Sequence, residues 1–369
     1  MDFIFGPLGY IVPFLLVLTI IVFVHEMGHY LVARWNGIAI QAFSIGFGPE
    51  LIGFNDRRGT RWKLSAIPLG GYVRFVGDMN AASVPDDEVI ANASPELQRQ
   101  LFVNKNVWQR ISVVVAGPAA NVIFTFLVLY ALLLGYGRYT VPAVIDEVTS
   151  GSVAEAAGMQ SGDVIVAVDG YEVRGFSDFQ RLVATAPERQ VTVVVDRNGT
   201  EQTLSMVPES ATTTDRFGNT QRVGRIGVTR TVDPNDVVLY RPGPIEAVGM
   251  TFEEVRFIID RTAAFLGDFF VGRGDVEQLG GPVKVAQVSN QVASLGFVAL
   301  INLMALLSLN IGIFNLLPIP MLDGGHLAYY LIEAARGRPL PQRIQEIGYR
   351  FGLAIVFTLM VFTLVNDIF

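Results

Sequence analysis

Two histidines and a glutamate lie close together in a long apolar run near the start of the chain. The run contains His25-Glu26-Met27-Gly28-His29, and the apolar residues on both sides place this motif on a helix. Residues four apart lie on one face of a helix, so His25 and His29 can direct their ring nitrogens at one metal ion. Glu26 then stands beside a water molecule that zinc can activate, and can accept its proton. The spacing predicts a hydrolytic zinc site.

The apolar surroundings argue that these residue types are not there by chance. A charge at the centre of a membrane helix costs roughly 2.5 to 3.5 kcal/mol, so three ionisable groups need a purpose. The chain has 3 histidines, two of which are in this motif, and 0 cysteines. Any zinc must therefore be held by imidazole and carboxylate, and we expect Zn²⁺ as the cofactor.

The third zinc ligand is expected from a distant segment that prolines interrupt. Catalytic zinc usually has three protein ligands and one open position. Asp323 and His326 both compete for the role, and we favour Asp323. Two histidines and one carboxylate leave a site of charge +1 in apolar surroundings, whereas three neutral histidines would leave +2. Glu333 is expected to be a solvated or interfacial charge at the start of the cytoplasmic loop. The segment reads Asn315-Leu316-Leu317-Pro318-Ile319-Pro320-Met321-Leu322-Asp323-Gly324-Gly325-His326.

Two asparagines precede the interruption and are candidate substrate-binding residues. Asn310 and Asn315 are polar residues in an otherwise apolar stretch. Such residues commonly form hydrogen bonds between helices, and either asparagine could have this structural role instead. Asn315 stands beside the proline break, where contact with the backbone of a substrate is equally plausible.

Composition favours a membrane protein. Hydrophobic residues make up 51% of the 369 residues and charged residues 17%. Four apolar stretches approach the ~20 residues that a membrane-spanning helix needs: 10–33, 111–134, 295–317 and 349–365. We therefore predict a mainly α-helical protein that crosses the lipid bilayer four times. The net charge is -7 and no basic tract is found, which argues against nucleic acid as a partner.

The loops predict the orientation of the four spans. Lys and Arg gather between spans one and two and between spans three and four, which places both loops in the cytoplasm. Both termini, and the long segment that follows span two, are then extracytoplasmic.

In these motifs the sequence resembles the site-2 protease family of intramembrane zinc metalloproteases. It is most similar to bacterial members of the regulator of sigma-E protease type, which cut anti-sigma factors and signal-peptide remnants. The resemblance implies that His25, His29 and Asp323 bind zinc and that Glu26 is the general base. It also implies a transmembrane peptide substrate and a place in the bacterial plasma membrane. A further matching motif is Ala116-Gly117-Pro118-Ala119-Ala120-Asn121.

Segments outside the spans are predicted to form two smaller structures. Residues 138–210 resemble an α+β PDZ domain, which either binds a peptide ligand or only obstructs large substrates. Short alternating runs after span one predict β-hairpins, and the resemblance implies that they form a membrane-associated sheet. The predicted order is span one (1–36), hairpins and linker (37–106), span two (107–137), PDZ domain (138–210), linker and amphipathic interfacial helices (211–293), span three (294–326), cytoplasmic loop (327–346) and span four (347–369).

One interpretation from a different functional class competes with the enzyme. A non-catalytic membrane scaffold or zinc-handling protein could use the same metal ligands and recruit partners through its PDZ domain.

Overall fold

The computed structural model describes residues 7–78, 87–214, 220–231, 233–270 and 280–368. Its contacts divide the chain into two compact units, which are described separately. The helical unit comprises Met1–Leu129 and Phe269–Phe369, and the α+β unit comprises Tyr130–Asp268. The predicted extracytoplasmic N-terminal end at residues 1–2, and residues 81–86 of the predicted linker, lie outside the described residues.

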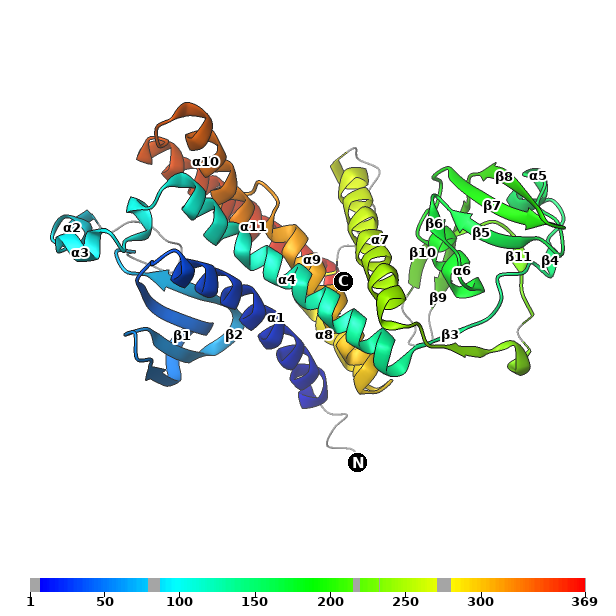
Figure 1. Cartoon of the computed structure of the whole chain (residues 1–369), viewed down its shortest axis with the longest axis horizontal. Helices are drawn as coiled ribbons and strands as arrows, with labels where there is room; N and C mark the ends of the chain where they lie inside the picture. Colours follow the sequence, from blue (N-terminus) through cyan, green and yellow to red (C-terminus); the bar gives the residue numbers. More distant parts are fainter. Residues whose placement is uncertain (1–6, 79–86, 215–219, 232, 271–279, 369) are drawn as a thin grey trace. The chain divides into compact units, whose positions relative to one another are not determined.

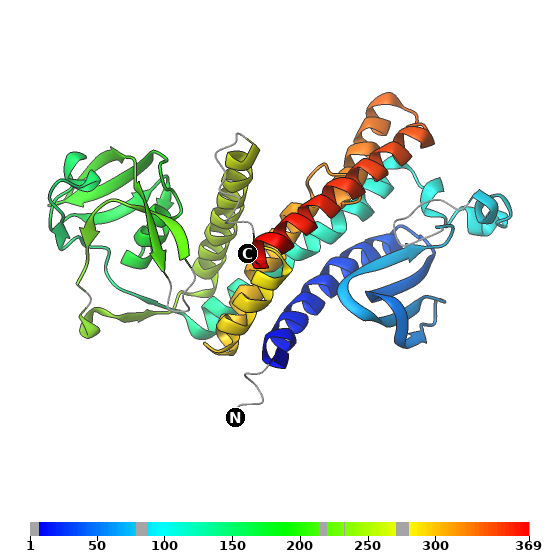
Figure 2. The ribbon, with the colours of Figure 1, turned by 180° about the vertical axis from the view of Figure 1, so that it is seen from behind.

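The helical unit contains long helices and one hairpin (Figures 1 and 2). Its elements are α1 (Pro7–Trp35), β1 (Ile40–Asn55), β2 (Arg61–Phe75), α2 (Asp87–Ala91), α3 (Pro95–Gln98), η1 (Phe102–Asn104), α4 (Val107–Tyr136, whose last turns belong to the other unit), α8 (Pro282–Ala293), α9 (Phe297–Asn315), α10 (Asp323–Arg336) and α11 (Gln342–Ile368).

Four of these helices are long and apolar enough to cross a membrane, as predicted. The candidate spans are Ile11–Trp35, Val107–Tyr136, Phe297–Asn315 and Arg343–Asp367. Trp35 ends the first span and Trp108 opens the second, and their side chains are 89% and 65% exposed. Exposed tryptophans at helix ends are typical of the boundary between lipid and water.

Glycines allow α1 and α4 to approach closely. A Cβ added to Gly28 of α1 would lie 2.2 Å from the carbonyl oxygen of Ala116 in α4. No side chain could be accommodated there without separating the helices. Small residues at helix contacts are the usual means of close packing in membranes. On its other side α1 contacts α8, whose first backbone N–H groups bond the carboxylate of Asp367 at 2.8 to 3.0 Å.

The chain is interrupted between α9 and α10, as the prolines predict. Pro318 and Pro320 lie in the interruption, and Met321 has a φ of 88°, a backbone conformation that bulky residues seldom adopt. Helix α10 starts at Asp323 and continues to Arg336, so much of the segment predicted as a loop at 327–346 is helical.

Glu333 of α10 does not have the environment that the sequence suggested. Of the two predicted environments, the solvated one is wrong, because the Glu333 side chain is 14% exposed and pairs with Arg110 of α4 at 2.5 Å. The guanidinium group of Arg110 also lies over the ring of Tyr330. This pair fixes the far end of α10 against the start of α4, and no local pattern predicts that these two residues meet.

The predicted hairpin forms a curled antiparallel sheet of β1 and β2. Residues 42–45 pair with 71–74 on one side and with 61–64 on the other, and 61–64 also pair with 52–55. The order of segments is therefore 52–55, 61–64, 42–45 and 71–74. Residues 71–74 form an outer edge, to which no other strand among the described residues is paired.

The turn of this hairpin is attached to α1 through Asp56. The Tyr30 hydroxyl of α1 and the Trp62 indole N–H both donate to the Asp56 carboxylate. Burial by itself would raise the pKa of Asp56, but these bonds and the backbone N–H groups of Arg58 and Thr60 outweigh it and lower the pKa to about 2.

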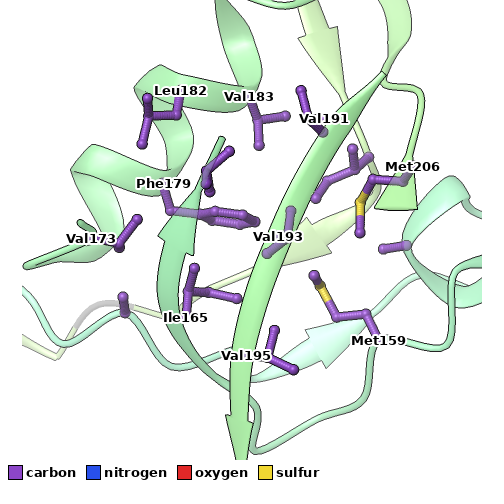
Figure 3. Close-up of a cluster of buried hydrophobic side chains, with 14 of the residues drawn as sticks. Met159, Ile165, Val173, Phe179, Leu182, Val183, Val191, Val193, Val195 and Met206 are labelled. Carbon is purple, nitrogen blue, oxygen red and sulfur yellow. The ribbon is translucent and has the colours of Figure 1, made fainter. Parts of the chain in front are cut away.

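The α+β unit is built around a four-stranded antiparallel sheet in the order β6-β5-β7-β8. Its core consists of apolar side chains from the sheet and from α6, including Ile165, Phe179 and Val193 (Figure 3). The elements are β3 (Arg138–Thr140), β4 (Glu147–Val148), α5 (Val153–Ala156), β5 (Val164–Val168), β6 (Tyr171–Glu172), α6 (Phe176–Ala184), β7 (Val191–Arg197), β8 (Thr200–Met206), β9 (Glu209–Thr214), β10 (Thr220–Arg225), β11 (Val228–Thr229), η2 (Pro234–Asp236), β12 (Val238–Tyr240) and α7 (Pro244–Phe270).

The segment predicted as a linker after residue 210 contributes to this unit. Strand β11 pairs with β4, and β12 pairs with β3. Ile226 belongs to the same buried cluster as the sheet residues. The polar composition of this segment hid its role, because short paired strands need few apolar side chains.

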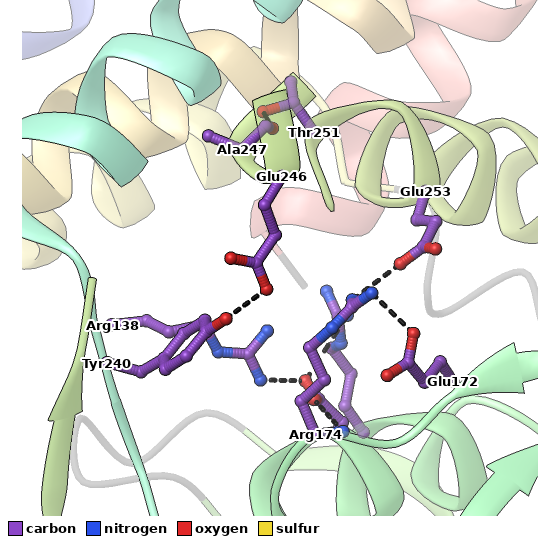
Figure 4. Close-up of polar contacts among 10 residues, drawn as sticks. Arg138, Glu172, Arg174, Tyr240, Glu246, Ala247, Thr251 and Glu253 are labelled. Atoms are coloured by element: carbon purple, nitrogen blue, oxygen red, sulfur yellow. Dashed lines mark hydrogen bonds and ion pairs between the residues drawn. The ribbon is translucent and has the colours of Figure 1, made fainter. Parts of the chain in front are cut away.

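Helix α7 is amphipathic, as predicted, but its polar face contacts protein. Arg174 pairs with Glu253 of α7 and with Glu172, each at 2.6 Å (Figure 4). Phe257 of α7 is buried in the core cluster, beneath the guanidinium group of Arg181. The exposed side chains of α7 include apolar ones, among them Ile245 and Phe252, as well as the charged Arg256 and Asp260.

Candidate metal centre

The structure brings together the three predicted zinc ligands from α1 and α10. The Nε2 atoms of His25 and His29 are 3.2 Å apart. Asp323 places Oδ2 3.1 Å from Nε2 of His25 and Oδ1 3.4 Å from Nε2 of His29. These three side chains form a group that could hold a metal ion.

The distances among these atoms fit a tetrahedral zinc site. Bonds of about 2.0 to 2.1 Å in a tetrahedron require ligand atoms about 3.3 Å apart, close to the separation of the two Nε2 atoms and to the distance from each Nε2 to one oxygen of Asp323. Oδ2 of Asp323 is also buried and has no hydrogen-bond partner among the described residues. A buried carboxylate oxygen in that position is satisfied by a cation. Two imidazoles and a carboxylate are a common donor set for catalytic zinc.

Each histidine is oriented by a contact of its other ring nitrogen with α4. Nδ1 of His29 lies 2.8 Å from the carbonyl oxygen of Val113. Because a carbonyl only accepts, Nδ1 carries the ring proton and Nε2 is left free to coordinate. Nδ1 of His25 lies 3.3 Å from the side-chain amide of Asn121.

Gly117 of α4 leaves the space that the two rings occupy. A Cβ added there would lie 2.3 Å from Nε2 of His29 and 2.9 Å from Cε1 of His25. Only glycine permits the helix backbone to lie this close to both imidazoles.

Asp323 is delivered by the interruption before α10. It is the first residue of that helix, where the exposed backbone N–H groups and the helix dipole favour a carboxylate. The next two residues are glycines that lie against the turn. A Cβ added to Gly324 would lie 2.2 Å from the carbonyl oxygen of Leu317, and a Cβ added to Gly325 would lie 2.4 Å from the carbonyl oxygen of Ile319. The prolines and glycines together place this carboxylate.

Glu26 lies beside the metal ligands and is 9% exposed. It lines a cavity of about 570 Å³ together with His25, His29 and Asp323. One wall of the cavity is the outer edge of the hairpin, including Gly71 and Tyr72. A Cβ added to Gly71 would lie 3.0 Å from Cγ of Glu26. The backbone of an edge strand therefore runs directly past the carboxylate.

The two candidate substrate-binding asparagines have different positions. Asn315 lines the cavity, next to the interruption. Asn310 is half-buried in α9 and is not among the described residues that line the cavity. His326, the rejected third ligand, also lines the cavity, and its Nδ1 lies 3.5 Å from the Tyr349 hydroxyl.

Sequence reasoning assigned no role to two residues that contact the centre. Gly117 and Asn121 both lie in the second motif, but their importance comes from contacts with α1, which no local pattern reveals. The available signals were the match of this motif to the family and an asparagine in the middle of an apolar span.

Comparison with known proteins identifies the family. Residues 13–359 match peptidase family M50. A relative in Agrobacterium fabrum is 50% identical over 361 residues, covering 98% of this chain and 96% of its own length. Another in Mesorhizobium japonicum is 50% identical over 363 residues, covering 98% and 99%. Both carry the words zinc metalloprotease in their names.

A more distant relative agrees with these two. Metalloprotease MmpA of Caulobacter vibrioides is 36% identical over 385 residues, covering 98% of this chain and 96% of the relative. With its four apolar helices, the chain is an integral membrane protein of peptidase family M50, the site-2 protease family, and is a zinc metalloprotease.

Proposed function

We propose that this metalloprotease hydrolyses a peptide bond within or near the transmembrane segment of single-span membrane proteins. The observation that carries the proposal is the position of Glu26, His25 and His29 in the middle of a helix that is apolar enough to span a membrane. A substrate would have to reach these residues from the lipid. Single-span anti-sigma factors and signal-peptide remnants are the proposed substrates.

His25, His29 and Asp323 are the proposed zinc ligands. Zinc, when bound, polarises the substrate carbonyl and lowers the pKa of water. Glu26 accepts the proton of the attacking water and then donates it to the leaving amine. Glu26 is 9% exposed, so most of its surface is covered by protein where this proton transfer would take place.

We propose that the outer edge of the hairpin binds the substrate. A peptide bond in a helix is shielded, so the substrate must be extended before its carbonyl is accessible. Residues 71–74 form a strand edge to which no other described strand is paired, and this edge lies along the cavity wall beside Glu26. Addition of a strand to such an edge is a common mode of peptide recognition. Asn315, on the cavity wall, is proposed to contact the backbone of the same substrate.

We further propose that residues 138–210 form a PDZ domain that lies outside the cytoplasm, together with both termini. The four-stranded sheet with its packed helix α6 supports this, and β8 is an edge strand to which an extended peptide could add. The Lys and Arg content of the two short loops supports the orientation.

Substitution of the proposed base tests the function. Glu26→Gln should retain zinc and abolish cleavage, whereas Glu147→Gln, at an exposed position of β4, should leave both unchanged. Membrane proteins of the source bacterium are quantified with each variant, and new chain ends are mapped. We expect single-span proteins to accumulate with Glu26→Gln and their cut sites to lie within the spans. Unchanged cleavage by Glu26→Gln, or cuts confined to soluble domains, would contradict the proposal.

A further inference from the structure

The side chain of Asn121 in α4 contacts a proposed zinc ligand and has no role in the hydrolysis described above. It is 0% exposed, and its Nδ2 lies 3.3 Å from Nδ1 of His25. Its Oδ1 is also buried and has no hydrogen-bond partner among the described residues. A buried amide with one end on a histidine and the other end unsatisfied needs an explanation.

The backbone of Asn121 is fixed by neighbouring residues. The hydroxyl of Thr125 donates to the Asn121 carbonyl oxygen at 2.9 Å, and the hydroxyl of Ser308 in α9 donates to it at 3.3 Å. Thr125 also bonds the carbonyl oxygen of Ala305, which ties α4 to α9. Gly312 of α9 lies close on the same side, since an added Cβ would be 3.2 Å from Cβ of Asn121. Rotation of the amide is the freedom that remains.

The chemistry of His25 determines which end of the amide must face it. Coordination through Nε2 puts the ring proton on Nδ1, which then needs an acceptor. His29 has such an acceptor in the carbonyl oxygen of Val113. The group at Nδ1 of His25 is the Asn121 amide, and a half-turn exchanges its nitrogen and oxygen. The end that suits a coordinating His25 is therefore Oδ1.

We propose that Asn121 is the positioning residue for His25. Its Oδ1 accepts the Nδ1 proton of His25 and holds the ring so that Nε2 points towards Asp323. The inference rests on the proposed role of His25 as a zinc ligand. His29 is held by the backbone, which no substitution removes, so the two ligands should respond differently to changes in α4.

Three variants of the full-length protein in detergent separate positioning from packing. Asn121→Leu keeps a similar volume and removes the acceptor, Asn121→Asp keeps an oxygen at the same place, and Thr125→Val removes a buried hydroxyl one turn away. Zinc affinity is measured by competition with a chelator. We expect a loss of about 10- to 100-fold for Asn121→Leu, and changes within about threefold for Asn121→Asp and Thr125→Val.

A spectroscopic measurement gives a second readout that packing alone would not move. The chain has 3 histidines, so its ring nitrogens can be assigned by ¹⁵N NMR with single histidine variants. In the zinc-loaded protein we expect a protonated, hydrogen-bonded Nδ1 on His25. Asn121→Leu should abolish the hydrogen-bond signature of His25 and leave that of His29 unchanged.

Two results would overturn the inference. One is wild-type zinc affinity and an unchanged His25 signal in Asn121→Leu. The other is an equal loss of affinity in Asn121→Asp and Asn121→Leu, with the His25 hydrogen bond intact in both. Failure of the ligand assignment itself is distinguishable, because His25→Ala would then bind zinc as tightly as the wild type.

Discussion

Substitution of Gly117 by alanine should remove zinc without unfolding the helices. The added Cβ would lie 2.3 Å from Nε2 of His29. Carbon atoms in ordinary contact are about 3.5 Å apart, so the His29 ring must move by about 1 Å. Metal sites tolerate deviations of about 0.2 Å in ligand distances, so this movement takes His29 out of coordination. Because loss of a ligand exceeds the loss of a supporting hydrogen bond, we expect zinc affinity to fall by ~100-fold or more.

The assay is zinc content after dialysis against a chelator, with cleavage of a membrane substrate measured in parallel. Gly135→Ala is the matched control, because Gly135 lies in the same helix and an added Cβ there meets no atom within 4 Å among the described residues. Circular dichroism should show the same helix content for both variants. If Gly117→Ala bound zinc with wild-type affinity, the close approach of α4 to the two rings would not be what shapes the site.

Two further substitutions test the supporting structure. Phe257→Ala should destabilise the α+β unit by about 3 to 5 kcal/mol, because a buried aromatic side chain is lost. Phe252→Ala, on the exposed face of α7, should change its stability by less than about 0.5 kcal/mol, and hydrogen exchange of β7 amides would show the difference. Since the pKa of Asp56 is lowered to about 2, its ionised form should stabilise the hairpin turn above about pH 4 and lose that effect as the pH falls towards 2. The fluorescence of Trp62, measured in a variant with Trp35 and Trp108 replaced by phenylalanine, should report this transition. A midpoint at pH 4 or above would contradict the lowered pKa of Asp56, and so would the same transition in Asp56→Asn.

Local patterns in the sequence were sufficient to predict the four spans, the hairpin and the motif on α1. These features depend on hydrophobicity and on residue spacing within one element, which can be read directly. The meeting of Asp323 with His25 and His29 was predicted from charge balance and from the resemblance to a family. The choice between an enzyme and a non-catalytic scaffold was decided by the family match, in favour of the enzyme.

Features that depend on contacts between distant segments could not be predicted. Glu333 looks like a surface charge until Arg110 is seen beside it. The acidic residues of α7 look like a solvated face until Arg174 and Arg181 are placed against them. In each case the partner lies far away in the chain. Acidic and basic residues are both common, so their spacing in the sequence does not show which of them form ion pairs.

The separation of the ligands along the chain has a consequence for biosynthesis. His25, Glu26 and His29 enter the membrane early, but Asp323 emerges only after roughly 300 more residues, which takes on the order of 15 to 60 s at ordinary rates of translation. During this time the half-built centre has two imidazoles and the Glu26 carboxylate, but it lacks Asp323, the third proposed zinc ligand. A nascent copy is therefore expected to be harmless to neighbouring membrane proteins until its last helices have been inserted.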